Sequence, residues 1–200
     1  MRALRYLIIL TLVLASPVTA QETGGTGEGT YGGSEGSYGG EATTSLGLSA
    51  ANRVATPQQV VVRLNAIREF CSDSGAYLVD CMAERMEQLS VGMSGLSGYQ
   101  DVRKTLGQTA GELRKIARDN RDPQAPRARV QHGDPRLKSS RPLVAVASDR
   151  KRQAAAAAIS ALEEAETILL RSAAQSTARA VQYQQIAAAL GSNKVLLRSL

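Results

Sequence analysis

The first clear hydrophobic pattern in the chain lies over residues 57–71. Its apolar positions recur at spacings of four, three and four residues and therefore share one helix face: Val60, Leu64, Ile67 and Cys71. Thr56 suits the cap position, Pro57 suits the first helical position, and Gln59 completes a capping-box pattern. Pattern and cap together predict a helix from 57 to 71.

Two further helical patterns follow, each after a turn sequence. Residues 72–75 read SDSG, which favours a turn. The next stripe predicts a helix over 76–90: Leu78, Cys81, Met82, Met86 and Leu89. A glycine-bearing turn at 91–98 separates it from a third stripe, which predicts a helix over 98–119: Val102, Leu106, Ala110, Leu113 and Ala117.

The most regular pattern is at the C-terminal end. Residues 149–190 contain neither proline nor glycine, are rich in alanine and have high helix propensity. Their seam alternates spacings of four and three: Ala155, Ile159, Leu162, Glu166, Leu169, Ala173, Ser176, Ala180, Tyr183, Ala187 and Leu190. This predicts one helix about 60 Å long. Gly191 is expected to end it, and Ser192 to cap a final short helix that carries Val195 and Leu200.

A helix of that length is longer than the three preceding helices can cover. Part of the 155–190 seam is therefore expected to contact a second copy of the chain or another helical protein, unless the helix bends. The scarcity of aromatic residues, six Tyr, one Phe and no Trp, favours closely packed helices with small side chains between them. The regular turn signals of a β-sandwich or barrel are absent from the sequence.

Two segments lack any helical period. Residues 21–54 are rich in glycine and acidic, and they predict a disordered leader. Residues 120–148 contain four prolines and predict a basic linker, whose end, RPLVAVAS, favours an extended segment packed across the helices. The fold class is thus all-α: a three-helix segment (55–119) containing a disulfide-clipped hairpin packs on the long C-terminal helix (149–200) in a bundle or coiled-coil-like arrangement.

The first twenty residues resemble a secretory signal peptide. Arg2 and Arg5 precede an apolar stretch of about ten residues, which is too short to span a bilayer. Val18 and Ala20 place small residues before a cleavage site at Gln21. We expect cleavage after Ala20 and export to the periplasm or medium, with no transmembrane span in the mature chain; an uncleaved anchor is the alternative.

The two cysteines, Cys71 and Cys81, are best explained by a disulfide. Their spacing is not C-x-x-C, and zinc would need two more ligands where the chain has only His132. An oxidising compartment favours the disulfide. On one continuous helix the two residues would lie about 15 Å apart, so the bond requires the turn at 72–75.

Charge adds one candidate binding segment. The formal net charge is +6, and about +4 once Arg2 and Arg5 are removed, which is too mild to indicate nucleic acid. The linker concentrates five cations as a candidate anion-binding site: Arg127, Arg129, Arg136, Lys138 and Arg141. Such a segment suits anionic lipid or lipopolysaccharide phosphates. The alternative is a soluble spacer kept extended by like charge.

Signals for catalysis are weak. His132 lies in a turn-like VQHGDP context, and no nucleophile motif, phosphate-binding glycine loop or metal-ligand spacing is present. The carboxylate pairs Asp80/Glu84, Glu84/Glu87 and Glu163/Glu164/Glu166 are interpreted as solvated helix faces, with neither cofactor nor metal. We therefore expect a non-catalytic exported protein, an interaction or structural module of the cell envelope. The alternatives are an anionic-surface binder and, less favoured, an envelope-polymer hydrolase.

Overall fold

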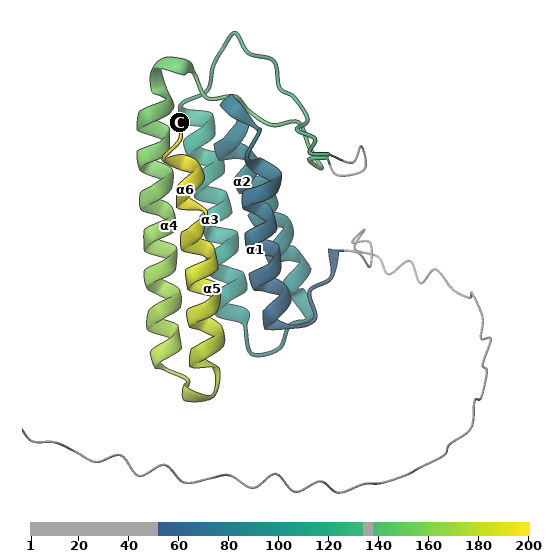
Figure 1. Ribbon diagram of the computed structural model, residues 1–200, viewed down its shortest axis with the longest axis vertical. Helices are drawn as coiled ribbons and strands as arrows, with labels where there is room; N and C mark the ends of the chain where they lie inside the picture. Colours follow the sequence, from purple (N-terminus) through teal and green to yellow (C-terminus); the bar gives the residue numbers. More distant parts are fainter. Residues whose placement is uncertain (1–51, 134–137) are drawn as a thin grey trace, which may run out of the picture. The chain divides into compact units, whose positions relative to one another are not determined.

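The computed structural model describes residues 52–133 and 138–200. Six α-helices lie in these ranges (Figure 1): α1 (Pro57–Cys71), α2 (Leu78–Gly92), α3 (Gln100–Asp119), α4 (Lys151–Ala174), α5 (Ala180–Ser192) and α6 (Lys194–Leu197). Short 3-10 turns precede or follow them: η2 (Gly75–Tyr77), η3 (Met93–Gly95), η4 (Ser148–Arg150) and η5 (Thr177–Arg179). The expected all-α class is confirmed, with no strand in either range. The predicted signal peptide and nearly all of the predicted leader lie outside the described residues.

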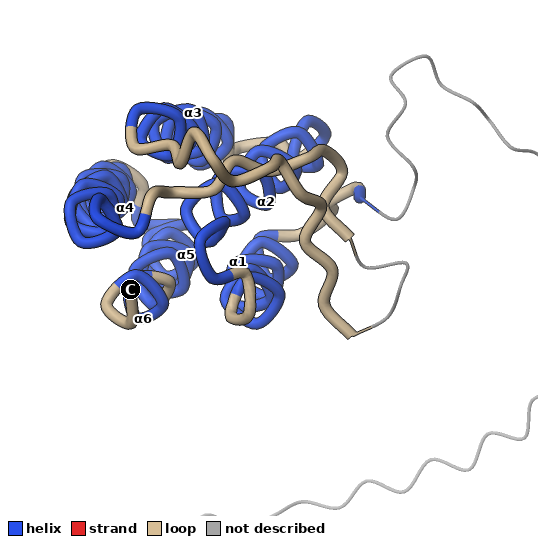
Figure 2. The backbone as a smooth tube through the Cα atoms, turned by 90° about the horizontal axis from the view of Figure 1, so that it is seen from above, coloured by secondary structure: helices blue, strands red, loops and turns tan. Residues whose placement is uncertain are grey.

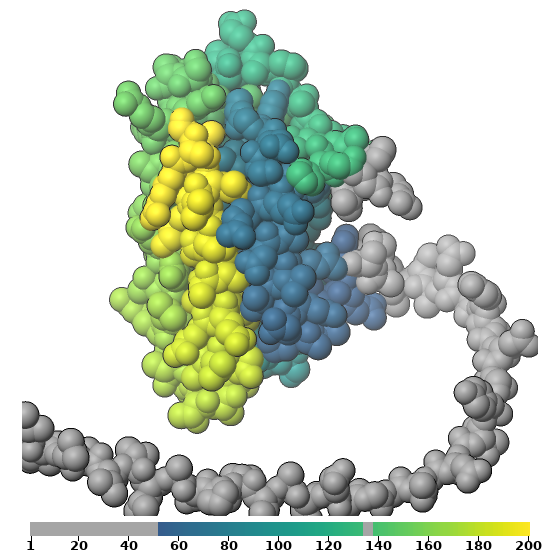
Figure 3. Space-filling model, in the orientation of Figure 1, coloured from purple at the N-terminus to yellow at the C-terminus, as the bar shows by residue number. Residues whose placement is uncertain are grey.

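The five longer helices of the described chain form a closed ring. Each packs on the next in sequence, from α1 through α2, α3 and α4 to α5, and α5 returns to pack on α1. Consecutive helices run in opposite directions (Figure 1), and the view from above shows them side by side (Figure 2). In Figure 3, α5 and α6 lie directly against α1. The amphipathic stripes therefore all face one shared interior.

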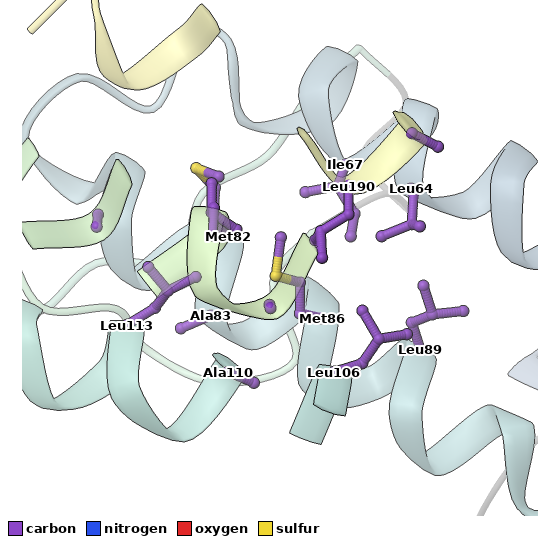
Figure 4. Close-up of a cluster of buried hydrophobic side chains, with 14 of the residues drawn as sticks. Leu64, Ile67, Met82, Ala83, Met86, Leu89, Leu106, Ala110, Leu113 and Leu190 are labelled. Carbon is purple, nitrogen blue, oxygen red and sulfur yellow. The ribbon is translucent and has the colours of Figure 1, made fainter. Parts of the chain in front are cut away.

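That interior is built from leucine, methionine and alanine. Figure 4 shows the region where α1, α2, α3 and α5 meet, with these side chains pointing toward one another: Leu64, Ile67, Met82, Met86, Leu106, Leu113 and Leu190. The helix α4 contributes mainly small side chains, including Ala154, Ala158 and Ala165, all of which are buried. Small residues let helix axes approach closely, as the scarcity of aromatic residues predicted.

The predicted start of α1 is confirmed. The Thr56 side chain accepts a hydrogen bond from the Gln59 amide (3.3 Å), and the Gln59 side chain accepts one from the Ala55 amide (2.8 Å). Residues 52–54, which we expected to belong to the leader, pack on the helices instead. Val54 is buried, and its amide donates to the Gly92 carbonyl at the end of α2 (2.9 Å).

The disulfide Cys71–Cys81 is present, with 5.9 Å between the two Cα atoms. Both residues are fully buried. The turn at 72–75 reverses the chain as predicted, and Gly75 adopts a positive φ of 52°, a conformation that suits glycine because it lacks Cβ. The disulfide therefore joins α1 and α2 beside the turn that connects them.

The prediction of one continuous C-terminal helix is wrong. The chain breaks after Ala174, turns through extended Ser176 and the η5 turn, and returns as α5 beside α4. The seam is buried between the two halves, with Leu162, Leu169 and Tyr183 at its centre. Folding back removes from water an apolar stripe that the shorter helices could not cover. The helix after the break runs through Gly191 to Ser192, so Gly191 does not end it.

The described residues of the linker, 120–133 and 138–148, form a strap across one end of the bundle (Figure 2). Two of its segments pair as an irregular antiparallel hairpin through three isolated bridges, Arg121–Val146, Ala128–Leu143 and Gln131–Lys138. Its RPLVAVAS end is extended and packed across the helices as expected, with residues 143–147 buried. The Val146 amide donates to the Ala76 carbonyl at the α1–α2 turn (2.8 Å).

No helix within 52–133 and 138–200 combines the length and apolar character needed to cross a bilayer.

Candidate functional site

Four arginines surround one depression where the strap meets the end of α3. Arg114 and Arg118 come from the last turns of α3, and Arg127 and Arg141 come from the two arms of the strap. The depression has a volume of about 260 Å³, and Asp80 of α2 is the one carboxylate in its wall. We call it the arginine depression.

The strap arm that carries Arg141 is fixed by Asp80. The Arg141 guanidinium donates two hydrogen bonds to the carboxylate, from Nη1 to Oδ2 (2.8 Å) and from Nη2 to Oδ1 (2.6 Å). The Val144 amide donates a third, to Asp80 Oδ2 (2.8 Å). The hydrogen bond to Asp80 raises the pKa of Arg141 above its ordinary value, against the opposing effect of burial. Arg141 therefore stays charged and rigidly placed.

Glu84, one helical turn beyond Asp80, fixes the same arm. Its Oε1 accepts hydrogen bonds from the Ser140 amide (2.8 Å), the Ser140 hydroxyl (2.6 Å) and the Gln88 side chain (2.5 Å). Asp80 and Glu84 are 0% and 1% exposed, so their interpretation as a solvated helix face is wrong. The strap buries both carboxylates, and their bonds to strap residues give them an architectural role.

The four arginines of the depression differ in how far they are already engaged. Arg141 is paired with Asp80, and Arg114 forms an ion pair with Glu87 of α2. Arg118 and Arg127 are exposed, and among the described residues neither side chain makes a hydrogen bond or ion pair. Two arginines held by carboxylates thus lie beside two that have no ion-pair partner among the described residues, an arrangement suited to an anionic group.

The predicted linker cluster is only partly assembled here. Arg127 and Arg141 line the depression. Arg129 is engaged within the strap, because its Nη1 donates to the carbonyls of Ser139 (2.8 Å) and Ser140 (2.5 Å). Lys138 is exposed but does not line the depression, and Arg136 lies outside the described residues.

Sequence reasoning missed the two arginines that α3 contributes. Arg114 and Arg118 are four residues apart on the helix, so they lie on the same face. That spacing was readable from the sequence. Their meeting with Arg127 was not, because it depends on where the strap crosses the end of α3. A neighbouring hollow of about 200 Å³ shares Arg127 and adds Arg121, which extends the basic surface along the strap.

The other residues considered for catalysis or metal binding do not come together at one site among the described residues. His132 is half-buried on the strap, with its Nδ1 3.6 Å from an oxygen of Asp73. Lys194 of α6 lies 2.8 Å from Glu166 and 3.8 Å from Glu163, so these two carboxylates face a cation. The ranges that the structure describes hold no group of three His, Cys, Asp or Glu side chains placed to bind a metal ion.

Comparisons with protein-family models, curated proteins and solved structures return no match to this chain.

Proposed function

We propose that this chain is a non-catalytic helical protein of the bacterial cell envelope or its surroundings, which binds phosphate-bearing anionic surfaces through the arginine depression. The observation that carries the proposal is the pairing of two exposed, unengaged arginines, Arg118 and Arg127, with two that are held in place. A planar guanidinium donates two hydrogen bonds in a geometry that matches phosphate. Lipid headgroups and lipopolysaccharide phosphates both present this chemistry.

The depression is a better basis for interaction than the 155–190 seam. The apolar members of that seam are largely buried inside the chain, between α4, α5 and their neighbours. A helical partner or second copy would have to use another surface. The arginine depression, in contrast, is open, and two of its arginines make no hydrogen bond or ion pair within residues 52–133 and 138–200.

Export of the chain is consistent with binding to the surface of the cell envelope. The signal-like segment at 1–20 and the buried Cys71–Cys81 disulfide both belong to proteins of oxidising, extracytoplasmic compartments. Intact mass measured on protein isolated from its native host tests this directly. We expect a chain that begins at Gln21 and gains two mass units on reduction after denaturation. A chain that retains residues 1–20 would contradict cleavage.

Binding is tested with vesicles that contain phosphatidylglycerol in phosphatidylcholine, at low ionic strength, by co-sedimentation of the mature protein. Arg118→Gln combined with Arg127→Gln removes two surface cations at about 1 kcal/mol each, so binding should weaken about thirtyfold. Because both side chains are exposed and unengaged, the fold should be retained, which a thermal melt checks.

The matched control is Arg171→Gln combined with Arg198→Gln. Both of these residues are exposed and neither lines the depression, so the net charge falls equally. If the control weakens binding as much as the test pair, attraction is only to net charge and the assigned site is wrong. If the unaltered protein does not bind anionic vesicles, or binds pure phosphatidylcholine equally well, the proposed function is wrong.

A further inference from the structure

A hollow of about 300 Å³ lies beside the first two helices of the described chain, and it shares no lining residue with the arginine depression. Ile67 and Phe70 of α1 and Leu89 of α2 form its apolar wall, and Val54 and the strap residue His132 also line it. Its volume is at the lower end of the range for ligand pockets. We call it the α1–α2 pocket.

The charged residues of the lining favour an occupant with one negative charge. They are two arginines and one glutamate, Arg63, Arg85 and Glu69, with a formal sum of +1. Arg63 already takes part in an interaction of its own. Arg85 is therefore the residue considered for contact with an anion in the pocket.

Arg85 has unmet hydrogen-bonding capacity beside the pocket. Its Nε lies 3.2 Å from Glu84 Oε2, and its Nη1 donates to the Gln88 side chain (3.3 Å). The guanidinium carbon lies 3.6 Å from the centre of the Phe70 ring, in cation–π geometry. Nη2 is buried and has no hydrogen-bond partner among the described residues. Burial lowers the pKa of Arg85, against the opposing effect of Glu84, so a second anion beside the guanidinium would stabilise its charged form.

The apolar wall defines the rest of the ligand. A volume of about 300 Å³ is that of roughly ten water molecules, and an aliphatic carboxylate of about eight carbons has about as many heavy atoms. The half-buried ring of Phe70 offers an alkyl chain a surface on which to leave water. A sugar or nucleotide of the same size carries hydroxyl groups that an apolar wall cannot hydrogen-bond.

We propose that the α1–α2 pocket binds an aliphatic carboxylate of about eight carbons, whose chain lies against Ile67, Phe70 and Leu89 and whose carboxylate accepts hydrogen bonds from Arg85. On binding, the guanidinium turns toward the pocket so that Nη2 donates to the carboxylate. The site is separate from the arginine depression and does not rest on the proposed binding of anionic surfaces.

The ligand class is tested on the mature protein by following its amide chemical shifts in nuclear magnetic resonance titrations. Octanoate should saturate with a dissociation constant of about a millimolar or below. It should bind roughly fifteenfold more tightly than hexanoate, because two further methylenes leave water. The amides that shift should be those of the pocket lining, including Phe70, Gln88 and Leu89. Absence of saturation, equal affinity for hexanoate, or shifts confined to Arg114 and Arg118 would overturn the proposal.

Arg85→Gln tests the role of the charge. Octanoate affinity should fall about tenfold, because a hydrogen bond between charged groups is lost. Binding of the neutral 1-octanol should change by less than about twofold, and its retention shows that the pocket is still formed. The matched control, Arg68→Gln, removes an exposed cation of α1 that does not line the pocket and should leave octanoate binding unchanged. Equal weakening in the two variants would overturn the assignment of Arg85.

Two further comparisons keep the test decisive. The titrations of the unaltered protein with octanoate and hexanoate do not depend on the stability of any variant, so they decide the ligand class even if Arg85→Gln fails to fold. Arg118→Gln combined with Arg127→Gln should leave octanoate binding unchanged. Loss of octanoate binding in that variant would place the ligand in the arginine depression and overturn the pocket as its site.

Discussion

The molecule contains two helical hairpins that are closed by different means. The first, α1–α2, turns at a sequence that favours turns, has Gly75 at positive φ, and is joined by the Cys71–Cys81 disulfide. The second, α4–α5, turns at Gln175 and Ser176, has neither glycine nor proline at the bend, and has no covalent link. The first hairpin is specified locally, whereas the second is specified by the apolar surface that it buries.

The two hairpins also differ in how closely their helices pack. Beside the first hairpin, Ile67 and Phe70 of α1 and Leu89 of α2 line a hollow of about 300 Å³. The helices α4 and α5 pack on each other and bury small residues such as Ala158, Ala165 and Ala187, together with Leu169 and Tyr183. A hairpin that is held by a covalent bond at one end can remain closed even where its helices pack imperfectly. A hairpin without such a bond depends on continuous contact along its length.

The largest effect should come from the packed hairpin. Leu169→Ala removes a fully buried side chain from α4 and leaves a cavity, so the free energy of unfolding should fall by about 3 kcal/mol. Urea denaturation followed by circular dichroism measures the loss. Leu170→Ala is the control, because Leu170 is 45% exposed and should change stability much less. Equal losses in the two variants would mean that α4 is not packed as described.

Removing the covalent bond should cost slightly less. Cys71→Ala combined with Cys81→Ala opens a loop of about eleven residues, and the chain-entropy relation gives a loss of about 2–3 kcal/mol. Urea denaturation with and without reductant measures it. Reductant should destabilise the unaltered protein by a similar amount and leave the double variant unchanged. Insensitivity of the unaltered protein to reductant under denaturing conditions would contradict a stabilising disulfide.

The turn of the first hairpin should show a smaller, local effect. Gly75→Ala places a Cβ at φ of 52°, which costs about 1 kcal/mol in the left-handed region. Gly95→Ala is the control, because that glycine has no positive φ and no atom near the position of a Cβ. Thermal melts of both variants provide the measurement. A Gly75→Ala protein as stable as the Gly95→Ala protein would show that the turn does not depend on glycine.

The smallest effect should follow from changing the bend of the second hairpin. Ser176→Ala combined with Thr177→Ala raises helix propensity across the break, yet stability should change by no more than about 0.5 kcal/mol. Light scattering should show the same mass as for the unaltered protein, because a straightened helix would expose the seam and associate. A stable, larger oligomer would mean that Ser176 and Thr177 themselves specify the bend.

The sequence predicted the elements better than their arrangement. The bounds of α1 and the disulfide follow from local spacing and capping, and both are confirmed. The prediction of one long C-terminal helix was wrong because helix propensity reflects only local conformational preference. It does not include the free energy gained when the seam is buried within the same chain. The meeting of Arg118 with Arg127 in the arginine depression could not be predicted either, because it depends on where the strap crosses the end of α3.

The buried carboxylates illustrate the same limit. Asp80 and Glu84 occur on a helix with the spacing of an ordinary polar face, and polar faces are usually solvated. They are buried because Arg141 and Ser140, about sixty residues later, supply partners that compensate their desolvation. Pairing over such a separation leaves no periodic signal in the sequence.

By itself, the sequence determined the all-α class, the first helix with its cap, and the disulfide at the first turn, because these depend on neighbours within a few residues. Only the tertiary structure decided that the alanine-rich segment folds back on itself, that the linker is a strap held by buried carboxylates, and that arginines from two segments converge. Each of these outcomes depends on which distant surface removes apolar area from water or compensates a buried charge, and that is a property of the assembled chain.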